Sequence, residues 1–445
     1  MAAKRTLNAK NLEALGAAVL AELLIEVSAG SAVMQRRLRL ALAAAEGAGG
    51  AAQEVRKRLA ALARATTYVD SRKRKALVVD LEAQHQAIAG PVAAVDPPLA
   101  LELLLRFLEL ADGVLDRCSD STGTVIGLFQ RAVVDLGPLA SAAAMPAEAL
   151  AEQLLELVFE NGYGQFDDLI PAVADALGDP GLRLLEQGCR DRGACAGHPA
   201  LLQIAECLGD VDGYMAQFDA KQLAWPPTAA DVAGHLLQAG RSQQALAVLD
   251  GAASAAAWHS PEWHDTRIAV LEALGRNDEA QQLRWACFAK TLSACHLREH
   301  LKRLAAFEDV EVEERAFALA EDHPMRLLAL NFLVRWPAVA RAGRLVLTHG
   351  PDWDGESYEI LAPAAERLSA EQPLAATVLL RAMLLFALST GRTKRYRHAA
   401  EHLGSCELLA ARIDAWQGVE RHESFVGRIR EAFGGRWSFW SLVER

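Results

Sequence analysis

The sequence predicts an all-α fold, either a solenoid of tetratricopeptide-like or HEAT-like helical repeats or an irregular superhelix of about fifteen to twenty helices. Alanine and leucine dominate the 445 residues, which are 52% hydrophobic and only 6% aromatic, and this composition favours helix almost throughout. Glycine and proline recur at the spacing expected of short helices. No segment sustains the polar–apolar alternation that a half-buried strand requires.

Three helices are expected at the start of the chain. Apolar residues three and four positions apart predict one helix over 11–30 with a single apolar face. Helices over 31–50 and 51–65 follow, the first of them ending in a glycine cluster. The apolar face of the first helix consists of Leu12, Leu15, Val19, Leu23 and Val27.

The next two helices carry clearer start and stop signals. Asp70 or Ser71 can cap a helix that ends at Gly90-Pro91. The following helix, over 96–120, begins with two prolines, which the first turn of a helix tolerates. Ser121 or Thr122 can then cap the helix after it.

The stretch FENGYGQFDDLI joins two further helices. Asn161-Gly162 is a good left-handed end for the preceding helix, and Asp167 or Asp168 can cap the next one. A plain turn does not require Tyr163, Gln165 or the second aspartate. The stretch is predicted to be a structural turn. In the alternative, Tyr163, Gln165 and the spare carboxylate face a pocket that they share with Asp116 and Asp120.

The second half of the chain contains a repeat. Residues 235–249 resemble 269–283, and within them a Gly-Arg turn and an alanine five residues later match at an offset of 35. The offset lies beside the 34-residue period of tetratricopeptide repeats. Residues 384–403 are a looser third copy. An irregular helical bundle is the alternative.

These patterns predict two regions, divided at Pro226-Pro227. Residues 1–225 are expected to form an amino-terminal helical array, and 226–445 a set of tetratricopeptide-like repeats. The array is asymmetric in charge, because 1–90 carry 14 Lys/Arg and 8 Asp/Glu, whereas 101–180 carry 3 Arg and 14 Asp/Glu. The acidic segment favours a basic partner.

Several stretches have a recognisable spelling, namely AAKRTLNAKNLEALG near the start, RCSDSTGTVIGLF and ENGYGQFDDLI in the middle, and PLAATVLLRAMLLFAL with RYRHAAEHL near the end. Together they resemble a family of bacterial all-helical proteins of unknown function. The carboxy-terminal third is also similar to the helical region that accompanies SWIM-type zinc fingers. The finger's Cys-x-Cys and Cys-x-His pairs are absent from the sequence, so the resemblance implies a helical fold and no activity.

The candidate binding residues are concentrated in the acidic segment and the stretch that follows it. The main interpretation is a solvated helix face, and the sharper one a carboxylate surface that receives a basic partner or a divalent cation. A metal-dependent enzyme or factor would use Asp112, Asp116, Asp167 and Asp168. The full candidate set is Asp112, Asp116, Asp120, Tyr163, Gln165, Asp167 and Asp168.

A third hypothesis is association of the basic region 1–90 with nucleic acid. It is disfavoured because aromatic side chains that could stack on bases are almost absent there. The residues that would contact phosphates are Arg36, Arg37, Lys57, Arg72 and Lys75.

Two weak metal-ligand patterns complete the candidates. His296 and His300 in HLREH match the His-x-x-Glu-His pattern of zinc peptidases, but no third ligand can be named. Four further residues could hold zinc at unusual spacing, namely Cys189, Cys195, His198 and Cys207.

The sequence as a whole indicates a non-catalytic helical scaffold that binds a protein or peptide partner and needs no cofactor. Glutamates interrupt the apolar start, so no export signal is expected. No apolar run reaches the roughly 18 residues of a membrane span. We therefore expect a cytoplasmic protein with reduced cysteines.

Overall fold

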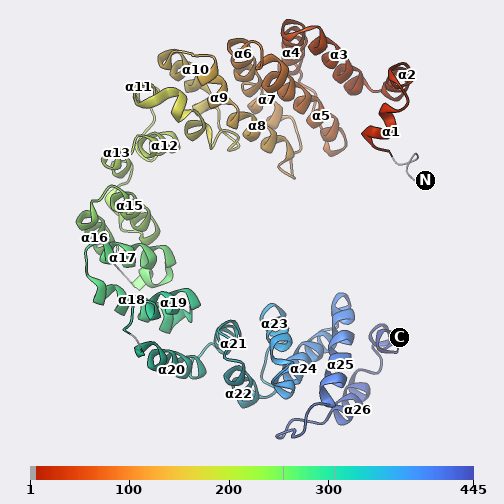
Figure 1. Cartoon of the computed structure of the whole chain (residues 1–445), viewed down its shortest axis with the longest axis vertical. Coiled ribbons are helices and arrows are strands. Elements are labelled where there is room, and N and C mark those ends of the chain that lie inside the picture. The colour runs from red at the N-terminus through yellow and green to blue at the C-terminus, as the bar shows by residue number, and fades with distance from the viewer. Residues whose placement is uncertain (1–6, 254, 306, 445) are drawn as a thin grey trace. The chain divides into compact units, whose positions relative to one another are not determined.

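The computed structural model describes residues 7–253, 255–305 and 307–444, and the regular elements in these ranges are helices (Figure 1). Within them, extended pairing is limited to one isolated bridge between Val69 and Cys118. The all-α prediction is confirmed. The helices outnumber the fifteen to twenty expected, because several consist of only one or two turns.

The chain divides into two compact units, one comprising residues up to Thr228 with Gln238–Gly240, the other Ala229–Leu237 and the chain from Arg241. The helices of the first unit are α1 (Ala9–Glu13), α2 (Ala17–Ser28), α3 (Ala32–Glu46), α4 (Ala48–Ala63), α5 (Ser71–Ala87), the π-turn η1 (Ile88–Val92), α6 (Pro97–Leu108), α7 (Ala111–Asp116), α8 (Thr124–Val134), α9 (Leu136–Ala142), α10 (Ala147–Phe159), α11 (Leu169–Asp191), α12 (Pro199–Cys207), α13 (Val211–Met215) and α14 (Ala220–Leu223). After α15 (Pro226–Gln238), which contributes to both, the second unit contains α16 (Ser242–Gly251), η2 (Ala255–His259), α17 (Pro261–Ala273), α18 (Asn277–Thr291), α19 (Ala294–Leu301), α20 (Glu308–Glu321), α21 (Arg326–Arg335), α22 (Val339–His349), α23 (Tyr358–Leu368), α24 (Pro373–Ser389), η3 (Thr393–Arg395), α25 (Tyr396–Ala410), α26 (His422–Phe433) and α27 (Trp437–Val443).

The predicted first helix is two helices. Gly16 has a φ of 80°, which breaks the chain between α1 and α2. The apolar face expected from the spacing is not covered, since Leu15, Val19 and Leu23 are all exposed and Val27 is 72% exposed. Among the described residues, the helices that pack most closely on α2 are α1 and α3, and the periodicity did not predict which side chains are buried.

Among the helix boundaries predicted in the first unit, the starts of α5 and α6 are confirmed, and the end at Gly90-Pro91 is wrong. Asp70 caps α5, its carboxylate accepting from the amides of Arg72 and Lys73. The helix does not stop at Gly90-Pro91, because a π-turn carries it on to Val92. The two prolines of α6 stand in its first turn as expected.

The core of the first unit is built on α4 to α12. Phe107 and Phe129 meet at its centre, with ring centroids 5.2 Å apart. His85 stacks on Phe107, and its Nε2 lies 2.8 Å from the Asp135 carboxylate, where α8 gives way to α9. In the described part of the chain, one stretch, Thr124–Ala142, is long and apolar enough to cross a membrane by length and composition, but half of it is buried in this core.

The aligned turns of the second half have the same backbone geometry. Gly240 and Gly275 are left-handed, with φ of 72° and 71°, and the following arginine amide donates to the carbonyl five residues earlier, at 2.8 and 2.9 Å. Ala245 and Ala280, the matched alanines, are fully buried. Gly391 of the looser copy makes the same turn, with φ 66°, and the Arg392 amide donates to the Ala387 carbonyl at 3.2 Å.

Candidate functional site

The segment between α10 and α11 is a closed turn held by its own polar side chains. Gln165 is fully buried; its Oε1 accepts from the Tyr163 amide at 2.9 Å and its Nε2 donates to the Glu160 carbonyl. Asn161 donates to Asp167 at 2.9 Å and accepts from the Phe166 amide at 2.8 Å. Most of the polar residues in this turn therefore serve to fold it.

The left-handed residue of this turn is Gly164, with φ 75°, and not Asn161 or Gly162 as predicted. The helix end at Asn161 is instead made by the asparagine side chain, which bonds forward into the turn. A Cβ on Gly164 would lie 2.8 Å from the Asp167 carboxylate, so both the φ and the contact favour glycine.

Tyr163 joins this turn to α7. Its hydroxyl donates to the Asp116 carboxylate at 2.5 Å, and this bond, with lesser contributions from burial and from the charges of Asp116 and Asp112, raises the pKa of the phenol. Asp112 lies one helical turn before Asp116, and its Oδ1 would be 3.8 Å from a Cβ on Gly162. The structure thus brings together three candidates from distant parts of the sequence.

We call Asp112, Asp116, Tyr163 and Asp167 the carboxylate surface. In the residues that the structure describes, no lysine or arginine forms an ion pair with these three aspartates. The three arginines of the acidic segment are engaged elsewhere: Arg106 with Glu102, Arg131 with Glu82, and Arg117 with backbone carbonyls. The negative charge of the surface is therefore not neutralised locally.

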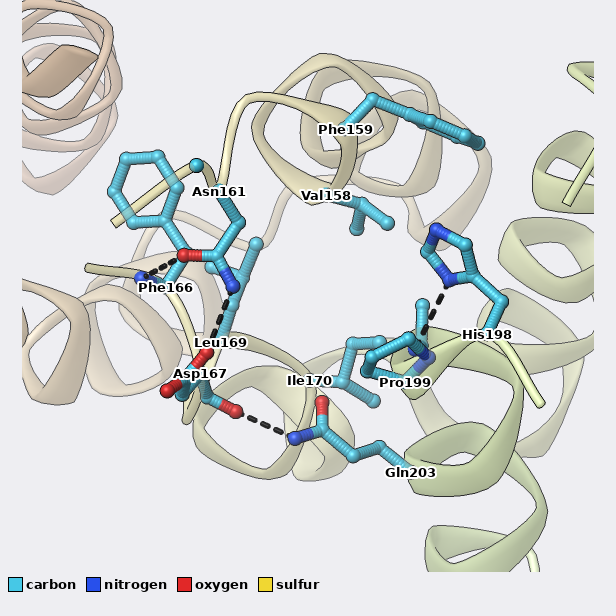
Figure 2. A pocket seen from close by; sticks show the side chains of 12 residues that line it. Val158, Phe159, Asn161, Phe166, Asp167, Leu169, Ile170, His198, Pro199 and Gln203 are labelled. Atoms are coloured by element: carbon cyan, nitrogen blue, oxygen red, sulfur yellow. Dashed lines mark hydrogen bonds between the residues drawn. The ribbon is translucent and has the colours of Figure 1, made fainter. Parts of the chain in front are cut away.

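A small cavity of about 250 Å³ opens beside the turn (Figure 2). Asn161 and Asp167 lie on one side of it, and Phe159 and His198 on the other, their rings 5.4 Å apart. Gln203 of α12 reaches the Asp167 carbonyl across its base. The sequence offered no signal for this wall, because Phe159 ends α10 whereas His198 and Gln203 belong to α12 and its cap.

The remaining carboxylate candidates are Asp120 and Asp168. The helix over 96–120 is interrupted, so Asp120 falls between α7 and α8. Asp120 caps α8 in place of Ser121 or Thr122, because its carboxylate accepts from three backbone amides at 2.9–3.0 Å. Asp168 is exposed at the start of α11, and its side chain makes no capping bond.

No group of three His, Cys, Asp or Glu side chains in the described ranges is arranged to hold a metal ion. His198 Nδ1 accepts from the Ala200 amide and caps α12, while burial raises the pKa of Cys189 to about 11. His296 pairs with Asp265 at 3.0 Å, and His300 is buried against Trp285. The other two weak candidates are Cys195, which is exposed, and Cys207, which is half-buried.

The basic candidates divide between paired and free side chains. Arg36 is tied to the buried Asp80 at 2.9 Å, and Lys57 to Glu54 at 2.8 Å. Arg37, Arg72 and Lys75 are exposed. Positions 4 and 5 of the basic region lie outside the described residues.

The chain is similar to one family of proteins. A family model, described as a family of unknown function (DUF6880), matches residues 2–199 and 190–442. The chain belongs to this family. No curated protein matches it. Membership in DUF6880 confirms the uncharacterised family expected from the sequence and assigns no activity.

Removing the Gln165 side-chain amide tests whether this turn stabilises this member of DUF6880. We expect Gln165→Leu to lower the free energy of unfolding by about 2 kcal/mol, because the Tyr163 amide and the Glu160 carbonyl both lose their partner. Tyr163→Phe removes only a bond at the surface and should cost much less. Urea unfolding followed by circular dichroism measures both, and equal losses would contradict the assignment.

Proposed function

We propose that this chain is a non-catalytic helical-repeat scaffold that binds a protein or peptide partner. A basic segment of that partner would contact the carboxylate surface. The observation that carries the proposal is the absence of a cationic partner for Asp112, Asp116 and Asp167 in the described residues. Asp112 and Asp116 stand one turn apart on α7, where like charges destabilise a helix by roughly 0.2–0.5 kcal/mol per pair. A lysine or arginine from a partner relieves that repulsion.

Two further features support a peptide-binding role. The pKa of Glu109, next to α7, is raised chiefly by burial and also by the nearby Glu160 carboxylate, while Arg106 opposes the rise. Two further carboxylates, Glu109 and Glu160, thus lie close to each other beside α7. The adjacent 250 Å³ cavity has room for a partner side chain between Asp167 and Phe159. The matched glycine turns of the second unit are the feature that favours a repeat architecture.

Fluorescence anisotropy with a labelled peptide of alternating arginine and serine tests the proposal. Asp112→Asn with Asp116→Asn is expected to weaken binding about fivefold or more, and raising the salt concentration should weaken binding to the unmodified protein. Glu308→Gln with Glu311→Gln makes the same change in charge on α20 and serves as the control. Equal weakening by the two double variants would show that only net charge matters and would refute the site.

A further inference from the structure

The second unit contains a larger groove that was not predicted from the sequence. It encloses about 850 Å³ and is lined by η2, α17, α18 and α19, with α21 at one side. We call it the α17–α19 groove. Apolar side chains, among them Ile268, Leu328 and Trp258, line much of it, and a few polar groups converge in it.

His264 is the most unusual of these polar groups. It is only 6% exposed, yet neither ring nitrogen has a hydrogen-bond partner among the described residues. Its ring packs against Trp258 and Trp263, at centroid distances of 4.8 and 5.2 Å. Burial, and next the charge of His296, lower its pKa. The imidazole is thus neutral at neutral pH and has one N–H donor and one acceptor, both buried and without a partner in the described residues.

The charges around the groove are paired except at one place. Glu272 accepts from Arg284 at 2.7 Å and from Arg303 at 2.8 Å. His296 lies 3.0 Å from Asp265. Lys290, in contrast, has no ion pair with any carboxylate in the part of the chain that is described.

Lys290 and His264 meet at one aromatic ring. The Lys290 ammonium lies 5.0 Å from the centroid of the Trp258 ring, against which His264 packs. Lys290 also acts on the titration of His264 as a nearby positive charge. The groove therefore combines an unpaired cation, an unused N–H donor and an aromatic wall, which together are the recognition elements for an organic anion with a flat apolar body.

We propose that the α17–α19 groove binds a small aromatic carboxylate, whose anionic end lies between Lys290 and the His264 N–H and whose ring packs on Trp258 and Ile268. The volume of the groove falls within the range of about 300–1,000 Å³ that small-molecule sites occupy. This site is independent of the carboxylate surface, which is acidic and selects the opposite charge.

Isothermal titration calorimetry with naphthylacetate and its uncharged analogue naphthylacetamide tests the proposal. The two probes share one ring system, so their difference in affinity isolates the contribution of the anionic group. Naphthylacetate is expected to bind about tenfold more tightly than the amide. Lys290→Met should abolish this difference, Lys290→Arg should preserve most of it, and Lys221→Met, on the exposed α14 of the first unit, should leave it unchanged.

Histidine NMR locates the bound probe. The ring signal of His264, assigned by its loss in His264→Phe, should shift on addition of naphthylacetate. Equal affinity for both probes, no shift of the His264 signal, or an equal loss in the Lys290→Met and Lys221→Met variants would overturn the assignment. Binding of a peptide of alternating leucine and glutamate without binding of naphthylacetate would also overturn it, in favour of a protein segment as the occupant.

Discussion

Gly137→Ala is expected to destabilise the first unit by at least about 3 kcal/mol, at the upper end of the usual cost of overpacking a core. Gly137 lies in α9 where this helix crosses α11. An added Cβ would lie 2.0 Å from the carbonyl oxygen of Ala172 and 3.1 Å from the carbonyl carbon of the same residue. Both are backbone atoms, so the contact can be relieved only by moving α9 away from α11.

Gly127→Ala, in α8, provides the matched control. The nearest atom to a new Cβ there is a flexible one, Arg131 Nη1, at 3.9 Å. Alanine should therefore stabilise this helix by about 0.5–1 kcal/mol, since glycine loses more backbone entropy on folding. Thermal and urea unfolding monitored by circular dichroism measure both variants. A neutral Gly137→Ala would show that α9 and α11 do not approach as closely as the structure indicates.

The sequence predicted those features of the fold that depend on a few neighbouring residues. Asp70 caps α5 because an aspartate directly before a helix can satisfy its first free amides. Gly240 and Gly275 end their helices in the left-handed conformation because no side chain opposes it. The exposed face of α2 could not be predicted, because spacing indicates an apolar face and not what packs against it.

For the candidate site, the sequence pointed to individual residues, but it did not predict most of the contacts that these residues make. Tyr163 and Asp116 were both proposed, and they are in contact across 47 positions of sequence. Gln165 was proposed as a binding residue, but it is fully buried, and both its amide oxygen and its amide nitrogen are hydrogen-bonded within the turn. The α17–α19 groove escaped prediction because His264, Lys290 and Trp258 form no motif and meet only when three helical elements pack together.

Asp80→Ala is expected to lower the free energy of unfolding by about 3 kcal/mol, because it removes the shared partner of two arginines at a buried position. The Asp80 side chain is 3% exposed, and its Oδ2 accepts from Arg36 at 2.9 Å and from Arg58 at 2.9 and 2.5 Å. The bonds tie α5 to α3 and α4. Without the carboxylate, the two guanidinium groups are held close together with no anion between them.

Glu102→Ala tests whether burial, and not the number of ion pairs, sets this cost. Glu102 also joins two arginines, Arg56 at 2.8 Å and Arg106 at 3.0 Å, but its side chain is 42% exposed. Its removal should change the free energy of unfolding by less than about 1 kcal/mol, because water replaces the lost partner. Asp80→Asn should fall between the two alanine variants, since the amide keeps the shape and one acceptor but not the charge. If the Asp80 and Glu102 alanine variants lose the same stability in urea, the three-helix contact does not depend on the buried carboxylate.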